Sequence, residues 1–319
     1  MPEVIVIGSG VIGLSAARCL QLAGYDVQIV TRKLPLSTTS VAAGAMWSAS
    51  DLEGRSRAWA IATLKHFIPL TKEANSGVTL QRMREVYADK VPDPWYRDLL
   101  PFFQRLSKHE LRGGLTGGYL MDVPIVAPPI YLERLREQFL AGGGTLELRT
   151  IETLDDLLGE APLLVNCTGV GARDVANDDA VYPIRGQTLL LDVSGIRVGY
   201  MDNVAIDHIF PRSDGVLIGG VKVKGDWNRQ LDPEISADIL QRCRRIEKRL
   251  AAAPVLKEFV GLRPGRDEVR LELERLADGG AIIHNYGHGS VGYTLSWGSA
   301  MEVVTLAGQT AAEPRKTQE

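Results

Sequence analysis

A short apolar run followed by closely spaced glycines opens the chain. Residues 3–7 are mostly β-branched and apolar, which is typical of a buried parallel strand, and the run stops at Gly8. Helical spacing continues over residues 14–23, and Gly24 ends it. A second strand is predicted over residues 25–30. The N-terminus therefore predicts a β-α-β unit.

Further strands and helices of this β-α-β type are predicted later in the chain, separated by stretches of a different kind. An amphipathic helix is predicted over 130–140, strands over 145–149, 163–165 and 281–284, and a helix of small residues over 291–308. Residues from about 50 to 126 are rich in Trp, Arg and Pro and show no such rhythm. After residue 183 strands alternate (187–193, 208–212 and 216–223) before a charged amphipathic helix at 235–252.

The glycines after the first strand form a dinucleotide fingerprint. Gly8 suits a tight turn, Gly10 lets a pyrophosphate approach the backbone, and Gly13 with Ala17 lets the helix pack closely on the strand. Phosphates would lie at the helix N-terminus, where free N–H groups point outward. The residues expected there include Ser9, Val11 and Ile12.

The residues at the end of the second strand do not distinguish NADP from a flavin nucleotide. An acidic residue that would bind the ribose hydroxyls is missing, and the strand ends in Thr31 and Arg32. Arg32 fits either the 2′-phosphate of NADP or a variant ribose contact in a flavoprotein.

Length and composition narrow the class of protein. The 319 residues suffice for two domains. A net charge of −3 argues against a nucleic-acid binder, and no apolar run is long enough for a membrane span. Three widely spaced cysteines, together with a start that lacks a basic signal-like region, favour the cytoplasm. Glycine makes up 33 residues, about one in ten, which raises the question of what approaches the backbone so closely.

The C-terminal segment carries a more specific pattern. His284-Asn-Tyr286-Gly-His288-Gly289-Ser290-Val-Gly292 separates a strand from a helix, and it resembles the D-amino-acid oxidase family, which includes D-aspartate oxidase. Other segments resemble that family in the same order along the chain: 38–45, 166–170, 185–187, 219–220, 260–266 and 269–272.

The resemblance implies an α/β fold with non-covalently bound FAD. A Rossmann-like FAD-binding domain would consist of residues 1–50, 127–182 and 261–319. An α+β substrate domain on a mixed, largely antiparallel sheet would consist of residues 51–126 and 183–260. Besides the fingerprint residues, the expected FAD contacts are Thr31, Arg32, Thr38, Thr39, Ala43, Gly44, Ala45, Ile151, Thr168, Gly169, Gly289, Ser290, Val291, Gly292, Tyr293 and Thr294.

The implied reaction is oxidation of a D-amino acid by hydride transfer from Cα to flavin N5. Oxygen becomes hydrogen peroxide, and the imino acid hydrolyses to a 2-oxo acid and ammonia. The expected partners are thus a small D-amino acid and oxygen, with a monomeric or homodimeric protein. The protein would mainly position the substrate, since the sequence shows no Ser/His/Asp set.

Four residues are expected to act on the substrate. By resemblance, Arg263 anchors the α-carboxylate, for which a guanidinium offers a bidentate fork. Ser290 stands where the amino-acid oxidases usually have glycine, and its carbonyl would accept from the amine. His208 replaces the family's carboxylate-binding tyrosine and could donate one hydrogen bond when neutral, while Tyr200 is the candidate substitute for a lid tyrosine.

Several alternatives stay open at this stage. Neutral or broad substrates are favoured over acidic ones, although Lys222 lies about where D-aspartate oxidases carry an arginine. A glycine- or sarcosine-type amine oxidase is a near rival. An NADP-binding dehydrogenase and an inactive flavin-binding protein are rivals from other classes. No metal site is expected, because His284 and His288 lie on a strand and a loop rather than on one helical face.

Overall fold

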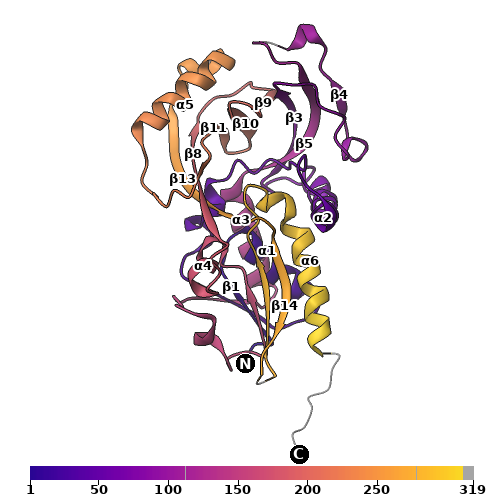
Figure 1. The fold of residues 1–319 in the computed structure, drawn as a ribbon, viewed down its shortest axis with the longest axis vertical. Helices are drawn as coiled ribbons and strands as arrows, with labels where there is room; N and C mark the ends of the chain where they lie inside the picture. Colours follow the sequence, from indigo (N-terminus) through magenta and orange to yellow (C-terminus); the bar gives the residue numbers. More distant parts are fainter. Residues whose placement is uncertain (112, 278, 312–319) are drawn as a thin grey trace, which may run out of the picture.

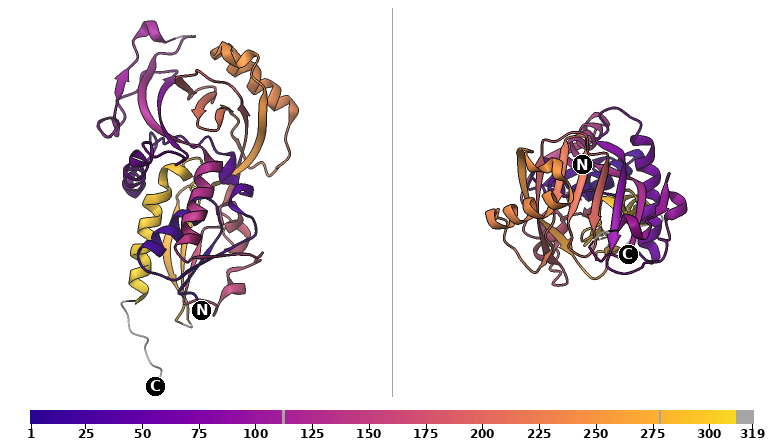
Figure 2. Two further views of the ribbon diagram at one scale, coloured as in Figure 1. Left: turned by 180° about the vertical axis from the view of Figure 1, so that it is seen from behind. Right: turned by 90° about the horizontal axis from the view of Figure 1, so that it is seen from above.

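The computed structural model describes residues 1–111, 113–277 and 279–311. Two β-sheets form two lobes stacked along the long axis of the molecule, with the first sheet in the lower lobe of Figure 1 and the second in the upper lobe. The view from behind in Figure 2 shows the same stacking. No helix among the described residues is long and apolar enough to cross a membrane.

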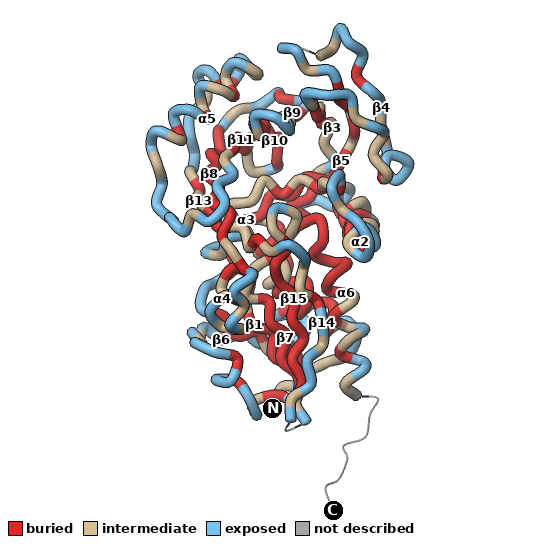
Figure 3. Tube along the Cα trace, viewed as in Figure 1, coloured by how far each residue is buried: buried red, intermediate tan, exposed pale blue. Residues whose placement is uncertain are grey.

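The first sheet has the strand order β14-β15-β7-β1-β2-β6. All neighbours run parallel except β14, which is antiparallel to β15. The buried residues concentrate along its strands (Figure 3), as expected for a parallel sheet covered on both faces. Its strands are β1 (Val4–Ile7), β2 (Val27–Thr31), β6 (Thr145–Leu148), β7 (Leu163–Asn166), β14 (Arg270–Arg275) and β15 (Ala281–Tyr286); the helices of this lobe are α1 (Val11–Leu22), α3 (Pro128–Ala141), α4 (Ala172–Val175) and α6 (Gly292–Ala311).

The second sheet has nine strands in the order β12-β8-β11-β10-β9-β3-β5-β4, with β13 also paired to β8. Every pairing is antiparallel except β3 with β9. Its strands are β3 (Val78–Tyr87), β4 (Phe103–Arg105), β5 (Gly117–Val126), β8 (Tyr182–Leu191), β9 (Val198–Asp202), β10 (His208–Arg212), β11 (Gly215–Gly219), β12 (Val223–Lys224) and β13 (Val255–Gly265); α2 (Gly54–Leu70) and α5 (Pro233–Ile246) complete the α-helices.

Short 3₁₀ helices fill several connections between these elements. They are η1 (Pro35–Ser37), η2 (Thr39–Ala42), η3 (Arg97–Leu99), η4 (Lys108–Glu110), η5 (Leu154–Leu157), η6 (Gly169–Gly171) and η7 (Lys248–Ala251).

The two faces of the second sheet have different neighbours. Phe210 and Leu217 belong to the large core shared with the first lobe, and we call this the inner face. Ile209 and Ile218 belong instead to a separate core with Cys243 of α5, which makes the outer face. Because strand side chains alternate between faces, each residue's register assigns it to one side.

The predicted α/β fold class is confirmed, with some boundaries shifted. The strand expected at 216–223 ends at Gly219, and the helix expected at 235–252 ends at Ile246. The stretch from 50 to 126, which showed no regular pattern, contains α2, β3 and β5. β13 runs from residue 255 to 265 in the second sheet and so crosses the domain boundary drawn after residue 260. The domain limits themselves stay a prediction.

Candidate functional site

The glycine fingerprint lies at the carboxyl end of β1. Gly8 has a φ of +107°, and a Cβ there would lie 2.7 Å from the carbonyl oxygen of Cys167. A Cβ on Gly13 would lie 1.9 Å from the carbonyl oxygen of Gly8, so only glycine permits this helix–strand contact. Gly10 caps α1 without a side-chain hydrogen bond, which leaves the first-turn N–H groups near Ile12 directed at the edge of the sheet.

The segment 38–45 crosses in front of this helix N-terminus. The Val11 N–H donates to Ser40 Oγ at 2.9 Å, and the Tyr293 hydroxyl donates to the Ser40 carbonyl at 3.0 Å. This segment includes Thr38, Thr39, Ala43, Gly44 and Ala45, and a Cβ on Gly44 would lie 2.7 Å from the Phe210 ring. The segment therefore joins the N-termini of α1 and α6 to the inner face of the second sheet.

The remaining expected cofactor residues extend along the same edge. The hydroxyls of Thr31 and Ser9 lie 3.2 Å apart at the end of β2. The exposed Arg32 reaches over β1 toward η6, with Nη2 4.0 Å from where a Cβ of Gly171 would stand, close to Thr168 and Gly169. Ile151 follows β6 and packs beside β2.

The loop after β15 brings the C-terminal signature to this edge. Gly287 and Gly289 have φ values of +87° and +53°, and the Gly289 N–H donates to the Pro264 carbonyl at 2.8 Å. Ser290 is exposed and stands just before α6, near Val291 and Gly292. The Thr294 hydroxyl accepts from the Ser48 N–H at 3.1 Å. The loop is thereby fixed both to β13 and to the segment after residue 45.

Arg263 lies on the inner face of β13, against Gly186 of β8. A Cβ on Gly186 would lie 2.4 Å from Nη1 of Arg263, and Nη1 donates to the Val221 carbonyl at 3.3 Å. Burial lowers the pKa of the Arg263 guanidinium. Among the residues that the structure describes, no carboxylate pairs with it. A buried guanidinium of this kind is suited to an anion supplied from outside the chain.

His208 lies beside Arg263 on the same face. Burial is the main reason that the pKa of its imidazole falls to about 4; the hydrogen bond to the Ile206 carbonyl opposes this shift and the charge of Arg263 adds to it, so the ring is neutral near pH 7. Nδ1 lies 3.2 Å from the Ile206 carbonyl, which can only accept, so we assign the proton to Nδ1. Nε2 is then an acceptor, and it is buried without a partner in the described part of the chain. In this tautomer Nε2 accepts a hydrogen bond rather than donating one, and the role of His208 toward the substrate stays a prediction.

Tyr200 does not join this group. It is the cross-strand partner of Ile209 and packs with the outer-face core, while its hydroxyl lies 3.4 Å from Asp202. The side chain that β9 presents beside His208 is Met201. Since adjacent residues of a strand point to opposite faces, Tyr200 cannot act as the expected lid tyrosine in this arrangement. Lys222 is exposed.

These residues fit a dinucleotide-bearing flavin. The glycine cradle and the first-turn N–H groups of α1 beyond Val11 suit the pyrophosphate, and the segment 38–45 continues from it to the inner face. Buried polar atoms without partners in the described residues gather at the same end of β15: both ring nitrogens of His288 and both side-chain atoms of Asn285. Such atoms are rare in proteins and are expected where a ligand supplies the partner.

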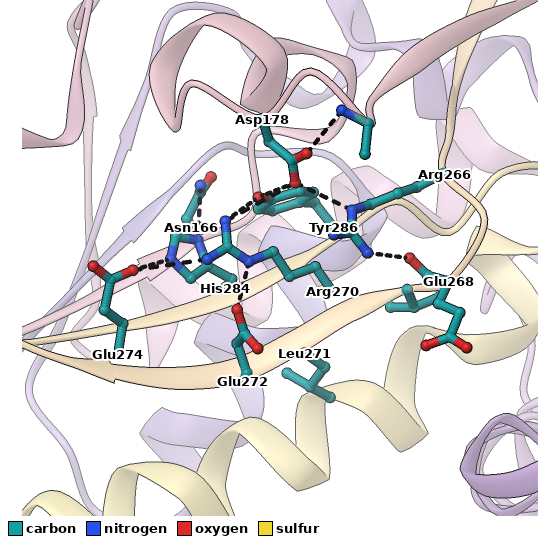
Figure 4. Close-up of polar contacts among 12 residues, drawn as sticks. Asn166, Asp178, Arg266, Glu268, Arg270, Leu271, Glu272, Glu274, His284 and Tyr286 are labelled. Carbon is teal, nitrogen blue, oxygen red and sulfur yellow. Dashed lines mark hydrogen bonds and ion pairs between the residues drawn. The ribbon is translucent and has the colours of Figure 1, made fainter.

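A polar network around Asp178 supports the loop after β15 (Figure 4). The Asp178 carboxylate accepts from the Tyr286 hydroxyl at 2.8 Å, from Arg266 Nε at 3.1 Å and from the Ala180 N–H at 3.0 Å. Burial acts to raise the pKa of Asp178, but these hydrogen bonds and the Arg266 charge lower it overall. The Arg266 side chain also packs on Gly287, where a Cβ would lie 2.9 Å from it.

Figure 4 shows how the network continues along β14 and β15. Arg270 donates to the Tyr286 hydroxyl at 2.8 Å and pairs with Glu272 at 2.6 Å. His284 Nε2 lies 2.9 Å from Glu274. No group of three or more His, Cys, Asp or Glu among the described residues could hold a metal ion.

Three features of the site were not predicted from the sequence. Ser40 lies within a segment that resembles the family, yet nothing local indicates that its hydroxyl meets α1. Asp178 follows α4 without any motif of its own. Glu85 lies in the stretch that showed no pattern, and only the pairing of β3 reveals its face.

Comparisons with known proteins place the chain among flavoenzymes. A family model described as "FAD dependent oxidoreductase" matches residues 3–306. A D-amino-acid oxidase of Rubrobacter xylanophilus is 41% identical over 95% of each chain, and a human D-aspartate oxidase is 32% identical over 96% of this chain and 95% of that one. The crystal structure of glycine oxidase from Geobacillus kaustophilus matches with a TM-score of 0.80 at 18% identity, covering 97% of this chain and 95% of that one, which shows a shared fold.

Proposed function

Because this chain belongs to the family of FAD-dependent oxidoreductases, we propose that it oxidises D-amino acids to 2-oxo acids, ammonia and hydrogen peroxide. The curated relatives named D-amino-acid oxidase support this, as they cover nearly the whole chain at up to 41% identity. The observation that carries the proposal is Arg263, a buried cation facing the cofactor edge without a carboxylate partner among the described residues.

When bound, FAD would supply the electron acceptor for oxidation of the substrate at Cα, with oxygen as the final acceptor. Arg263 binds the substrate α-carboxylate through its guanidinium fork. The neutral His208 offers Nε2 as an acceptor to an N–H of the substrate amine. Together the two residues fix the substrate so that Cα–H points at the flavin, which is the main requirement of this chemistry.

The cofactor contacts in this proposal follow the edge already described. The first-turn N–H groups of α1 beyond Val11 would bind the pyrophosphate, and Arg32 supplies a positive charge above β1. The start of α6, at Gly292 and Tyr293, carries the positive end of the helix dipole and would stabilise negative charge on a flavin ring held beside it. The FAD-binding domain comprises 1–50, 127–182 and 261–319, and the substrate domain the remainder. We expect a cytoplasmic monomer or homodimer.

The test is peroxide release by the purified yellow protein with a panel of D-amino acids, with the matching L-amino acids as controls. We expect turnover with D- but not L-enantiomers. Glycine and sarcosine belong in the panel, because a preference for them would indicate the amine-oxidase alternative. If the protein retains FAD but releases no peroxide with any member of the panel, the alternative of an inactive flavin-binding protein is supported.

A further inference from the structure

Glu85 of β3 is a buried acid whose hydrogen-bonding capacity is only partly used. Its exposed fraction is 1%, and Oε1 accepts from the Asn203 amide at 2.8 Å. Oε2 is also buried and accepts no hydrogen bond of ordinary geometry in the part of the chain that the structure describes, although the Tyr87 hydroxyl lies close to the carboxyl. An unused carboxylate oxygen in the interior is costly unless something else meets it.

The strand pairings place Glu85 in the same row as His208. Glu85 of β3 is in register with Met201 of β9, and Met201 is in register with His208 of β10. Residues in register on neighbouring strands point to the same face, so Glu85 lies on the inner face, two strands from His208. Neighbouring strands are about 4.8 Å apart, which puts the two backbone positions about 10 Å from each other.

Arg263 lies beyond His208 in the opposite direction from Glu85. The segment Gly219–Val221 connects them, since His208 packs on Gly219 and Arg263 donates to the Val221 carbonyl. A substrate whose carboxylate binds Arg263 and whose amine meets His208 would direct its side chain along this row toward Glu85, over Met201, which lies between the two strands. An extended lysine side chain spans about 6 Å from Cα to Nζ, a suitable length for that direction.

The surroundings of Glu85 favour a cation over an anion. Burial, the largest effect, holds the pKa of the Glu85 carboxyl above its usual range, with nearby Asp51 acting in the same direction and the Asn203 amide and the neighbouring Tyr87 hydroxyl acting against it. The neighbouring Tyr96 and Ser50 hydroxyls bond to each other at 3.0 Å. A substrate ammonium or guanidinium would stabilise the ionised carboxylate, whereas an acidic side chain would be repelled.

We propose that Glu85 binds the positively charged end of the substrate side chain, so that the enzyme prefers D-amino acids with basic side chains. This rests on the proposed function, because the placement of the substrate depends on Arg263. The neutral state of His208 agrees with it, since no positive imidazole is available there to attract an acidic side chain.

The decisive variant is Glu85→Gln, which keeps the shape of the side chain and an oxygen to accept from Asn203. We expect kcat/KM for D-lysine and D-arginine to fall at least 30-fold, mostly through KM, and that for D-alanine to change less than 3-fold. Glu110→Gln, on an exposed 3₁₀ turn, is the matched control and should leave all three substrates unchanged. An equal loss for D-alanine and D-lysine would overturn the assignment.

A binding experiment separates this inference from the oxidase proposal. 6-Aminohexanoate has a carboxylate and a distant ammonium but no α-amine to oxidise, and hexanoate lacks the ammonium. We expect the FAD-loaded protein to bind 6-aminohexanoate at least 10-fold more tightly than hexanoate, followed by changes in the flavin absorbance, and Glu85→Gln to abolish the difference. Equal affinities in the unaltered protein, or a preference that persists in the variant, would refute the role of Glu85 even if peroxide is released. A Glu85-dependent preference without any turnover would refute only the oxidase.

Discussion

Asp178 and Arg263 are both largely buried charged side chains, yet only Asp178 meets opposite charge within the described residues. Asp178 accepts from Tyr286, Arg266 and the Ala180 N–H, and it lies at the centre of a network that continues to Glu274. Arg263 and the nearby His208 Nε2 and Glu85 Oε2 all lack such partners.

The difference indicates a division of labour. A network whose charges are compensated stabilises the folded chain, because removing one member leaves the others buried and unpaired. A row of uncompensated groups costs stability and is retained for a ligand that completes it. Substitutions in the two places should therefore affect different measurements.

The largest effect is expected for Arg263→Ala. Loss of the buried carboxylate anchor should lower kcat/KM for D-amino acids on the order of 1,000-fold, or about 4 kcal/mol of transition-state stabilisation. FAD should remain bound and the thermal midpoint should hold or rise, since an uncompensated buried charge is removed. Steady-state kinetics and thermal unfolding check both, with Arg249→Ala, an exposed residue paired to Glu247, as control. Unchanged turnover would remove Arg263 from the site.

Asp178→Ala should have the opposite effect, lowering stability while changing kcat little. Tyr286, Arg266 and Arg270 would lose their shared acceptor, and we expect the free energy of unfolding to fall by about 3 kcal/mol. Because Arg266 packs on Gly287, FAD affinity should weaken, but kcat at saturating FAD should stay within about threefold. Urea unfolding and FAD titration measure these. A variant as stable as the parent would contradict the stabilising role of the network.

His208, one of these buried groups without an opposite charge, should also make the stability of the protein depend on pH. His208 has a folded pKa of about 4, below its ordinary value of 6.5, so the unfolded chain binds more protons between those values. Stability should then fall as pH drops through this window, by roughly 2 kcal/mol from this residue between pH 7 and pH 5. Unfolding of the parent and of His208→Leu at both pH values tests this, and the variant should lose correspondingly less. Equal losses would mean that His208 is not buried and neutral.

The smallest effect is expected at Tyr200. Its side chain is on the outer face, so Tyr200→Phe should change kcat/KM less than twofold for every substrate. The same kinetic panel measures it, and a tenfold loss would show that the sheet does not separate Tyr200 from the substrate.

Features that depend on contacts between residues close in the sequence could be predicted, whereas features that depend on the pairing of distant strands could not. Gly8 and Gly13 are needed by a turn and a helix–strand contact within six residues, so the pattern alone predicts the β-α-β unit. The face of Tyr200 and the row that joins Glu85 to His208 depend on β9 pairing between β3 and β10.

No local pattern encodes a register between segments more than 100 residues apart. β3 was also hidden because its inner face carries Glu85, and this buried charge interrupts the alternation that would have revealed the strand.

Strand β13 fixes the distance between the proposed substrate anchor, Arg263, and the proposed cofactor site. On β13, Gly261 lies against the segment 38–45, Arg263 is the proposed carboxylate anchor, and the Pro264 carbonyl holds the loop before α6. Insertions in the loops of either lobe leave this spacing intact. A single residue inserted between Gly261 and Arg263 would turn the guanidinium onto the face covered by α5. Variation in length across related enzymes should thus accumulate around β13 and avoid its interior.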